Sequence, residues 1–108
     1  MKKVVIETSM IEKNVYLVFD VKIHNIKNYQ EYINRGKPIV EKYGGEYIIR
    51  GGSIDIMEKD LWEPTRMVLI KFPNKEAALS WYNSDEYQPV KKIRQENSTS
   101  TLLFIDGV

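Results

Sequence analysis

The order of strand-like and helix-like patterns predicts an α+β fold of the ferredoxin-like, split βαβ type, an antiparallel sheet with helices on one face. Residues 15–24 and 66–72 alternate along the chain with a period of two, as strands do. Residues 26–43 and 75–96 repeat apolar side chains every three or four positions, as amphipathic helices do. With one strand between them and one at the end, the order is β-α-β-β-α-(α)-β.

The first strand is predicted from Val15 to His24. The residues on one of its sides are all apolar: Val15, Leu17, Phe19, Val21 and Ile23. This alternation predicts one buried face. Asp20 falls on the other side. If that side faced a cavity, Asp20 would be a buried acid in need of a partner such as Arg50.

The first helix is predicted from about Ile26 to Tyr43. Asn25 is a favourable N-cap, and Gly44-Gly45 can take the left-handed conformation that ends a helix. Pro38 interrupts this segment. Because proline has no N–H to donate to the carbonyl four residues earlier, we expect a kink there or two shorter helices.

A second strand is predicted from Glu46 to Met57, irregular at Gly51-Gly52, where the backbone can bulge or turn. Lys59 to Pro64 reads as a turn, and Arg66 to Phe72 as the third strand. The short polar connection between these strands favours an antiparallel hairpin.

The remaining elements are two helical segments and a last strand. Asn74 is expected to cap a helix whose apolar face includes Trp81, and Ser84 is expected to cap a second helix that continues to about Glu96. Thr99 to Asp106 is the last strand.

The length of 108 residues predicts one domain, at 15–108, preceded by an extension at 1–14. That extension contains apolar residues such as Val4, Val5 and Ile6, so we expect either an extra edge strand or an arm that packs on a partner chain. The outer sheet face would stay uncovered in a monomer, which predicts a homodimer joined through that face.

Composition excludes several functions. Sixteen basic and fifteen acidic residues nearly cancel, which gives no support for nucleic-acid binding. The chain has no cysteine and one histidine, His24, so we expect no metal site and no cofactor. No apolar run approaches the ~20 residues of a membrane helix, so we expect a cytoplasmic protein without membrane contact.

The chain resembles the family known as "domain of unknown function 1330", a branch of the dimeric α+β barrel superfamily, from about Tyr16 to Gly107. The residues that carry the resemblance are Tyr29, Tyr32, Tyr43-Gly44-Gly45, Arg50-Gly51-Gly52, Glu58, Trp62-Glu63-Pro64-Thr65-Arg66, Phe72-Pro73, Ala77-Ala78, Trp81-Tyr82, Ser84, Tyr87-Gln88 and Arg94. The resemblance implies a ferredoxin-like protomer, a dimer joined through the sheets and no established reaction. The sequence departs from the family pattern at Asn25, often an acid, and at Lys59, usually a glycine.

The sequence predicts a pocket between sheet and helices that binds a small polar or anionic metabolite. The predicted ligand-binding residues are Arg50, Gly51, Glu58, Trp62, Arg66, Trp81, Tyr87 and Arg94. An arginine beside a flexible glycine is a suitable anchor for a carboxylate, since its guanidinium can bind both oxygens. The tryptophans would supply apolar walls.

Alternatives remain open for these residues. Glu58 and Arg66 could form a structural ion pair at the hairpin end, and Trp62 could be a pocket lid or a dimer contact. Relatives in the wider superfamily include cofactor-free monooxygenases and lactone isomerases, so a cofactor-free enzyme is the second interpretation, with Glu58 and His24 as acid/base candidates. The third is an interaction dimer without a ligand.

Overall fold

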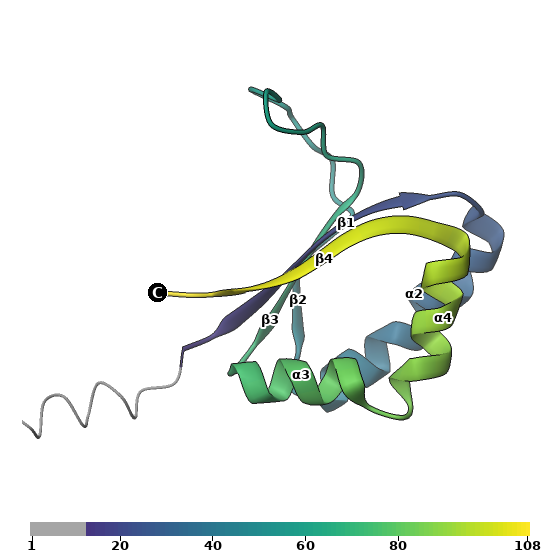
Figure 1. Cartoon of the computed structure of the whole chain (residues 1–108), viewed down its shortest axis with the longest axis vertical. Coiled ribbons are helices and arrows are strands. Elements are labelled where there is room, and N and C mark those ends of the chain that lie inside the picture. Colours follow the sequence, from purple (N-terminus) through teal and green to yellow (C-terminus); the bar gives the residue numbers. More distant parts are fainter. Residues whose placement is uncertain (1–12) are drawn as a thin grey trace, which may run out of the picture.

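The computed structural model describes residues 13–108 and contains a four-stranded antiparallel sheet in the order β2-β3-β1-β4 (Figure 1). The elements are β1 Val15–Ile23, α2 Ile26–Lys42, β2 Glu46–Arg50, β3 Met67–Phe72, α3 Lys75–Asn83, α4 Tyr87–Asn97 and β4 Ser98–Asp106. This order and topology confirm the predicted ferredoxin-like α+β fold. The extra strand or arm expected within residues 1–14 falls, apart from residues 13 and 14, outside the described residues.

The central strand β1 separates a buried face from an open one. Val15, Leu17, Phe19 and Val21 are buried beneath the helices, as their alternation predicts. β3 follows the same rule: Val68, Ile70 and Phe72 are buried, and the residues between them are only partly buried. Because successive strand residues point to opposite faces, Asp20 lies on the open face of the sheet, away from Arg50.

Helix α2 begins as predicted and ends at Lys42, one residue before the predicted Tyr43. The side chain of Asn25 accepts a hydrogen bond from the Asn28 N–H at 3.1 Å, which confirms the N-cap. The helix runs through Pro38 without a break, so the alternative of two shorter helices is wrong. Proline removes a single helical N–H, and burial of Tyr29 and Val40 on the inner face holds the helix against the sheet.

Strand β2 is shorter than the sequence predicts, because it ends at Arg50 and not at Met57. Gly51 has a φ of +71°, and its N–H donates to the Met67 carbonyl at 2.9 Å, which closes the ladder. The chain then leaves the sheet as a long loop, residues 51–66, which stands away from the body of the protein (Figure 1). The predicted short hairpin connection is therefore wrong, although the two strands do pair antiparallel.

The two C-terminal helices are joined by hydrogen bonds at Ser84. Asn74 caps α3 by accepting from the Ala77 N–H at 2.8 Å. The Ser84 hydroxyl donates to the Trp81 carbonyl at 2.9 Å and accepts from the Tyr87 N–H at 3.2 Å. These bonds fix the angle at which α4 leaves α3. Ser84 is the C-cap of α3, whereas the N-cap position of α4 is Glu86 and not the predicted Ser84.

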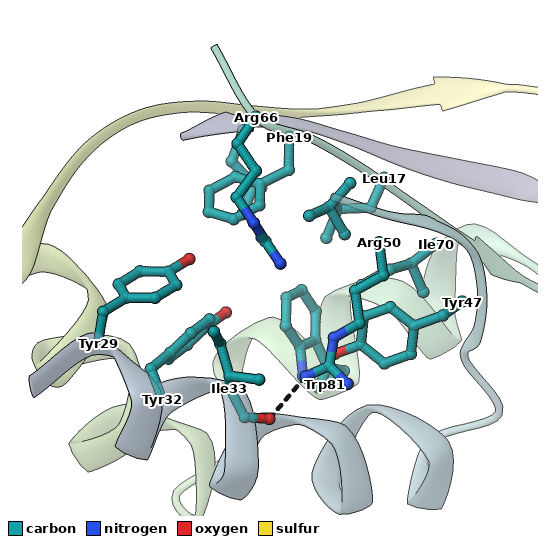
Figure 2. A pocket seen from close by; sticks show the side chains of 12 residues that line it. Leu17, Phe19, Tyr29, Tyr32, Ile33, Tyr47, Arg50, Arg66, Ile70 and Trp81 are labelled. Atoms are coloured by element: carbon teal, nitrogen blue, oxygen red, sulfur yellow. Dashed lines mark hydrogen bonds between the residues drawn. The ribbon is translucent and has the colours of Figure 1, made fainter. Parts of the chain in front are cut away.

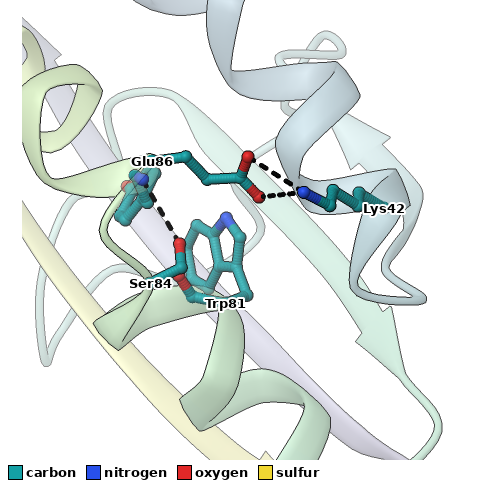
Figure 3. A network of polar contacts seen from close by, with 5 residues as sticks. Lys42, Trp81, Ser84 and Glu86 are labelled. Atoms are coloured by element: carbon teal, nitrogen blue, oxygen red, sulfur yellow. Dashed lines mark hydrogen bonds and ion pairs between the residues drawn. The ribbon is translucent and has the colours of Figure 1, made fainter.

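An ion pair connects α2 to the start of α4. Both carboxylate oxygens of Glu86 lie 3.1 Å from Lys42 Nζ (Figure 3). The buried Trp81 Nε1 has no hydrogen-bond partner in residues 13–108, and Figure 3 shows it on the side of the ring that faces Glu86. A water molecule between these groups would satisfy the indole N–H.

We expect Gly45→Ala to destabilise the fold, because its position is closely packed. An added Cβ would lie 2.5 Å from Val40 Cγ1 and 2.9 Å from Phe72 Cε1. The free energy of unfolding, measured by urea denaturation, should fall by about 1–3 kcal/mol. Gly52→Ala is the control, since nothing lies within 4 Å of a Cβ there, and it should change stability by less than about 0.5 kcal/mol. Equal effects of the two substitutions would contradict the packing argument.

Candidate functional site

A small cavity lies between the sheet and the helices, where strand and helix side chains converge (Figure 2). Its lining residues are Leu17, Phe19, Tyr29, Tyr32, Ile33, Tyr47, Arg50, Arg66, Val68, Ile70, Trp81 and Leu102. The volume open to the centre of a water molecule is about 20 Å³, which is room for about one water. Anything larger must displace a lining side chain.

Arg66 brings an unpartnered positive charge into this cavity. Its side chain points from the sheet toward α2 in Figure 2. Within residues 13–108 its guanidinium has no hydrogen-bond acceptor and no carboxylate partner. Gly51 provides the space it occupies, because a Cβ there would lie 2.7 Å from Arg66 Nε. The sequence predicted an arginine beside the flexible Gly51. The structure contains such a pair, but the arginine side chain in contact with Gly51 is that of Arg66.

Arg50 is held more firmly, at the end of β2. Its Nη2 donates to the Ile33 carbonyl of α2 at 2.6 Å, and its guanidinium lies 4.5 Å from the centre of the Tyr47 ring. These contacts connect the edge strand to the helix across the mouth of the cavity (Figure 2). Part of the role of Arg50 is therefore structural.

Arg94 is a buried cation next to the cavity. Its side chain comes from α4, is 4% exposed, and lies 5.3 Å from the centre of the Phe19 ring. Its Nη1 donates to the Ser100 hydroxyl at 2.9 Å, and its Nε is buried without a partner in residues 13–108. Although burial opposes the charge, the phenols of Tyr87 and Tyr32 outweigh it and keep the pKa of Arg94 above its ordinary value. Arg94 therefore stays charged.

Four tyrosines surround these cations. The hydroxyls of Tyr32 and Tyr87 lie 2.8 Å apart. Burial raises the pKa of Tyr29 and of Tyr47 to about 12, and it raises the pKa of Tyr32 and of Tyr87 as well. These phenols are neutral near pH 7, so they can donate hydrogen bonds to an anion but are poor proton acceptors.

The arrangement favours a bound anion. The guanidiniums of Arg50 and Arg66 line the cavity and that of Arg94 lines a hollow beside it, and the residues within 13–108 that line the two spaces include no carboxylate. In such surroundings the attraction between opposite charges is much stronger than in water. A ligand carboxylate would supply the missing negative charge and could bind a guanidinium through both oxygens.

The structure separates the predicted site residues into two groups. Arg50, Arg66 and Trp81 line the cavity, with Tyr87 and Arg94 beside them. The other three are Gly51, which lies against Arg66, and Glu58 and Trp62, which belong to the exposed loop. Because β2 ends early, residue 58 does not reach the end of a hairpin, and Glu58 forms no ion pair with Arg66 within residues 13–108.

Asp20 fixes the base of the loop on the open face. Its Oδ1 accepts from the N–H groups of Thr65 at 2.9 Å and Arg66 at 3.2 Å, and its Oδ2 accepts from Trp62 Nε1 at 3.0 Å. Asp20 and Trp62 also line a groove on that face, together with Val18, Met67, Thr101, Leu103 and Ile105. By the same measure as the cavity, this groove has a volume of about 460 Å³.

His24 lies away from the cavity. It follows the end of β1, is exposed, and its Nε2 lies 2.7 Å from the Thr99 hydroxyl. Within the part of the chain that the structure describes, no group of three or more His, Asp or Glu side chains could hold a metal ion. In the same part, no helix has the length and apolar character needed to cross a membrane.

Sequence reasoning missed three tyrosines of the site, namely Tyr29, Tyr32 and Tyr47. The signal for the first two was their spacing of three on the inner face of α2, which also fits plain core packing. Tyr47 stands near Arg50 on the same short strand, and a cation above an aromatic ring is a known pairing.

Solved structures share this fold at low sequence identity. RPA0582 from Rhodopseudomonas palustris, a protein of unknown function, has a TM-score of 0.73 and 15% identity, covering 100% of this chain and 94% of its own. SnoaB, a cofactor-independent oxygenase from Streptomyces nogalater, has a TM-score of 0.65 and 14% identity, covering 89% and 94%. A protein from Bacteroides thetaiotaomicron, described as a possible oxidoreductase, has a TM-score of 0.58 and 17% identity, covering 90% and 100%. The fold is that of the dimeric α+β barrel proteins.

The family model for a domain of unknown function, DUF1330, matches residues 14–108. The chain therefore belongs to the DUF1330 family, which confirms the resemblance seen in its motifs. A comparison with curated proteins finds no match. Because a shared fold does not carry a shared activity, the function has to be argued from the site itself.

We expect the buried phenols to ionise late in an alkaline titration. Tyr29 and Tyr47 have a pKa of about 12 in the folded state, against about 10 in an unfolded chain. The unfolded state thus loses these protons first, so their contribution to stability is complete below pH 10 and is lost as the pH rises toward 12. Phenolate absorbance should show a late group of tyrosines that is smaller in Tyr47→Phe. Ionisation of every phenol near pH 10 in folded protein would contradict this assignment.

Proposed function

We propose that the protein binds a small carboxylate-bearing metabolite in the cavity between sheet and helices, with Arg66 as the principal anion ligand. The observation that supports this most directly is the Arg66 guanidinium, which lies in the cavity without a partner in residues 13–108. Arg66 is partly buried, so its unpaired cation has lost part of its hydration, and a bound carboxylate would offset that cost.

The surrounding side chains suit the rest of such a ligand. Neutral phenols of Tyr29 and Tyr32 would donate hydrogen bonds to it, and Trp81 with Phe19 would form the apolar wall. The cavity is too small for such a ligand, so binding requires lining side chains to move apart. In this proposal Gly51 keeps space for Arg66, whereas Glu58 and Trp62 lie on the exposed loop and do not line the cavity.

We expect a thermal-shift screen against small carboxylates, phosphates and lactones to find a carboxylate that stabilises the protein. At a hundred times its dissociation constant, a ligand adds about 2.7 kcal/mol to the free energy of unfolding. The shift should disappear in Arg66→Gln, which keeps most of the side-chain volume without the charge, and weaken in Arg50→Ala.

The matched control is Arg35→Gln, because Arg35 forms an exposed pair with Glu31 on α2, 3.0 Å apart, and does not line the cavity. This variant should bind as the parent protein does. A shift that survives in Arg66→Gln would refute the assignment. Failure of every carboxylate would leave the interaction dimer without a ligand as the better interpretation.

We further propose that the open face of the sheet joins two copies of the chain. Its groove is largely apolar, and Leu103 and Ile105 on it are 41% and 51% exposed. Apolar surface of this kind is typical of an interaction site, and an isologous pair is the simplest way to cover it. Trp62 at the groove would then act as a dimer contact.

Light scattering should give the mass of two chains for the parent protein and of one chain for Leu103→Lys, because a charge would be buried in the interface. Leu79→Lys is the control, since Leu79 is similarly exposed, at 39%, but lies on α3. A monomeric parent protein, or a dimeric Leu103→Lys variant, would count against the interface.

A cofactor-free enzyme is the second candidate, and the likeness to the SnoaB fold favours it. The acid/base candidates Glu58 and His24 do not line the cavity, so catalysis there would depend on arginines and neutral phenols. Such groups can stabilise an enolate or a similar anion that forms during a reaction. Oxygen uptake in the presence of a bound carboxylate would distinguish turnover from binding.

A further inference from the structure

A second hollow lies beside the cavity. It is lined by Tyr82, Arg94, Gln95, Ser98, Ser100 and Leu102, and its volume, measured in the same way, is about 330 Å³. Leu102 lines both spaces, so its side chain is a shared wall between them. The hollow is more polar than the cavity, because two serine hydroxyls and a guanidinium contribute to it.

Like Arg66 in the cavity, Arg94 brings to this hollow a cation that has no carboxylate partner in residues 13–108. It is almost completely buried and forms no ion pair within residues 13–108, and its Nε has no hydrogen-bond partner there. Its Nη1 is fixed by Ser100 at 2.9 Å. A buried charge without a counter-ion is costly, so this position suits a second anionic group.

The two cations lie on adjoining spaces, because Arg66 lines the cavity, Arg94 lines the hollow and Leu102 lines both. The ring of Phe19, which also lines the cavity, has its centre 5.3 Å from the Arg94 guanidinium. A short molecule could therefore reach from one guanidinium to the other past Leu102. The cavity alone holds about one water, so a ligand bound at Arg66 has to extend beyond it, and the adjoining hollow is the larger space.

We propose that the ligand is a short dicarboxylate, with one carboxylate bound by Arg66 and the other by Arg94. This inference rests on the proposed carboxylate site at Arg66 and adds the second anchor. Each planar guanidinium matches one planar carboxylate, and the Ser100 hydroxyl, which accepts from Arg94 Nη1, still has its own proton to donate to the second group. Ser98 also lines the hollow, but its hydroxyl donates to the Arg94 carbonyl. Leu102 moves aside when the ligand spans both spaces.

The test compares acids of equal carbon number by titration calorimetry on the full chain: butyrate with succinate, and hexanoate with adipate. In the parent protein we expect one dicarboxylate to bind about tenfold more tightly than its monocarboxylate counterpart, as an added charge-assisted contact should allow. In Arg94→Gln the ratio of the two affinities should fall to about one. In Arg66→Gln both members of the pair should weaken.

A second variant covers the case in which Arg94→Gln does not fold, as judged by circular dichroism. Leu102→Ala removes the shared wall, so it should increase the preference for the dicarboxylate, whereas Leu79→Ala on the outer surface should not change it. An unchanged preference in Leu102→Ala would overturn the proposal.

Three further outcomes would also overturn it. They are equal binding of both acids to the parent protein, a preference that persists in folded Arg94→Gln, and tighter binding of inorganic phosphate than of any dicarboxylate. If no carboxylate binds at all, the proposed function fails together with this inference. If monocarboxylates bind through Arg66 without a dicarboxylate preference, only the second anchor fails.

Discussion

Two backbone N–H groups, those of Thr65 and Arg66, donate to one oxygen of Asp20, and the place where the chain re-enters the sheet depends on these bonds. The long loop ends there, and β3 begins one residue later. Because the carboxylate lies on the open face, it holds the Arg66 backbone from behind while the guanidinium extends into the cavity on the other face. Loop, groove and cavity are thus connected through a single side chain.

The charge distribution around the cavity explains how so many cations are tolerated. Arg50 is compensated by a helix carbonyl and an aromatic ring, and Arg94 by a hydroxyl, phenols and the ring of Phe19. These partners are dipoles and π faces. They stabilise a cation less than a carboxylate does, and they leave its positive charge in place. The site therefore keeps its positive charge available to an incoming anion.

Most of the fold could be predicted from the sequence because the burial pattern follows the sequence periodicity. The alternation in β1 and the N-caps at Asn25 and Asn74 are local signals, and the structure agrees with them. The end of β2 could not be predicted, since Ile54 and Ile56 continue a strand-like alternation beyond Gly51. In the structure the pairing of β2 with β3 stops at Arg50, and this end of the pairing cannot be seen in the sequence.

The candidate site was partly predictable from local motifs. Arg50 stands out in the sequence because Gly51-Gly52 follows it, and Arg66 was selected as part of the Trp62–Arg66 motif of the family resemblance. An inward tyrosine such as Tyr29 is indistinguishable from a core residue until its hydroxyl is seen beside a guanidinium. The role of Asp20 also depended on which face β1 turns to the helices, and periodicity alone does not assign that direction.

The two tryptophans occupy opposite sides of the sheet and so experience different solvents. Trp81 is 1% exposed, with its ring 4.4 Å from that of Tyr87, whereas Trp62 is 54% exposed beside the groove. Since indole emission shifts to longer wavelength in water, the intrinsic fluorescence of a single, unpaired chain has a buried and a hydrated component. The protein therefore carries a separate optical reporter for each face, and neither requires a label.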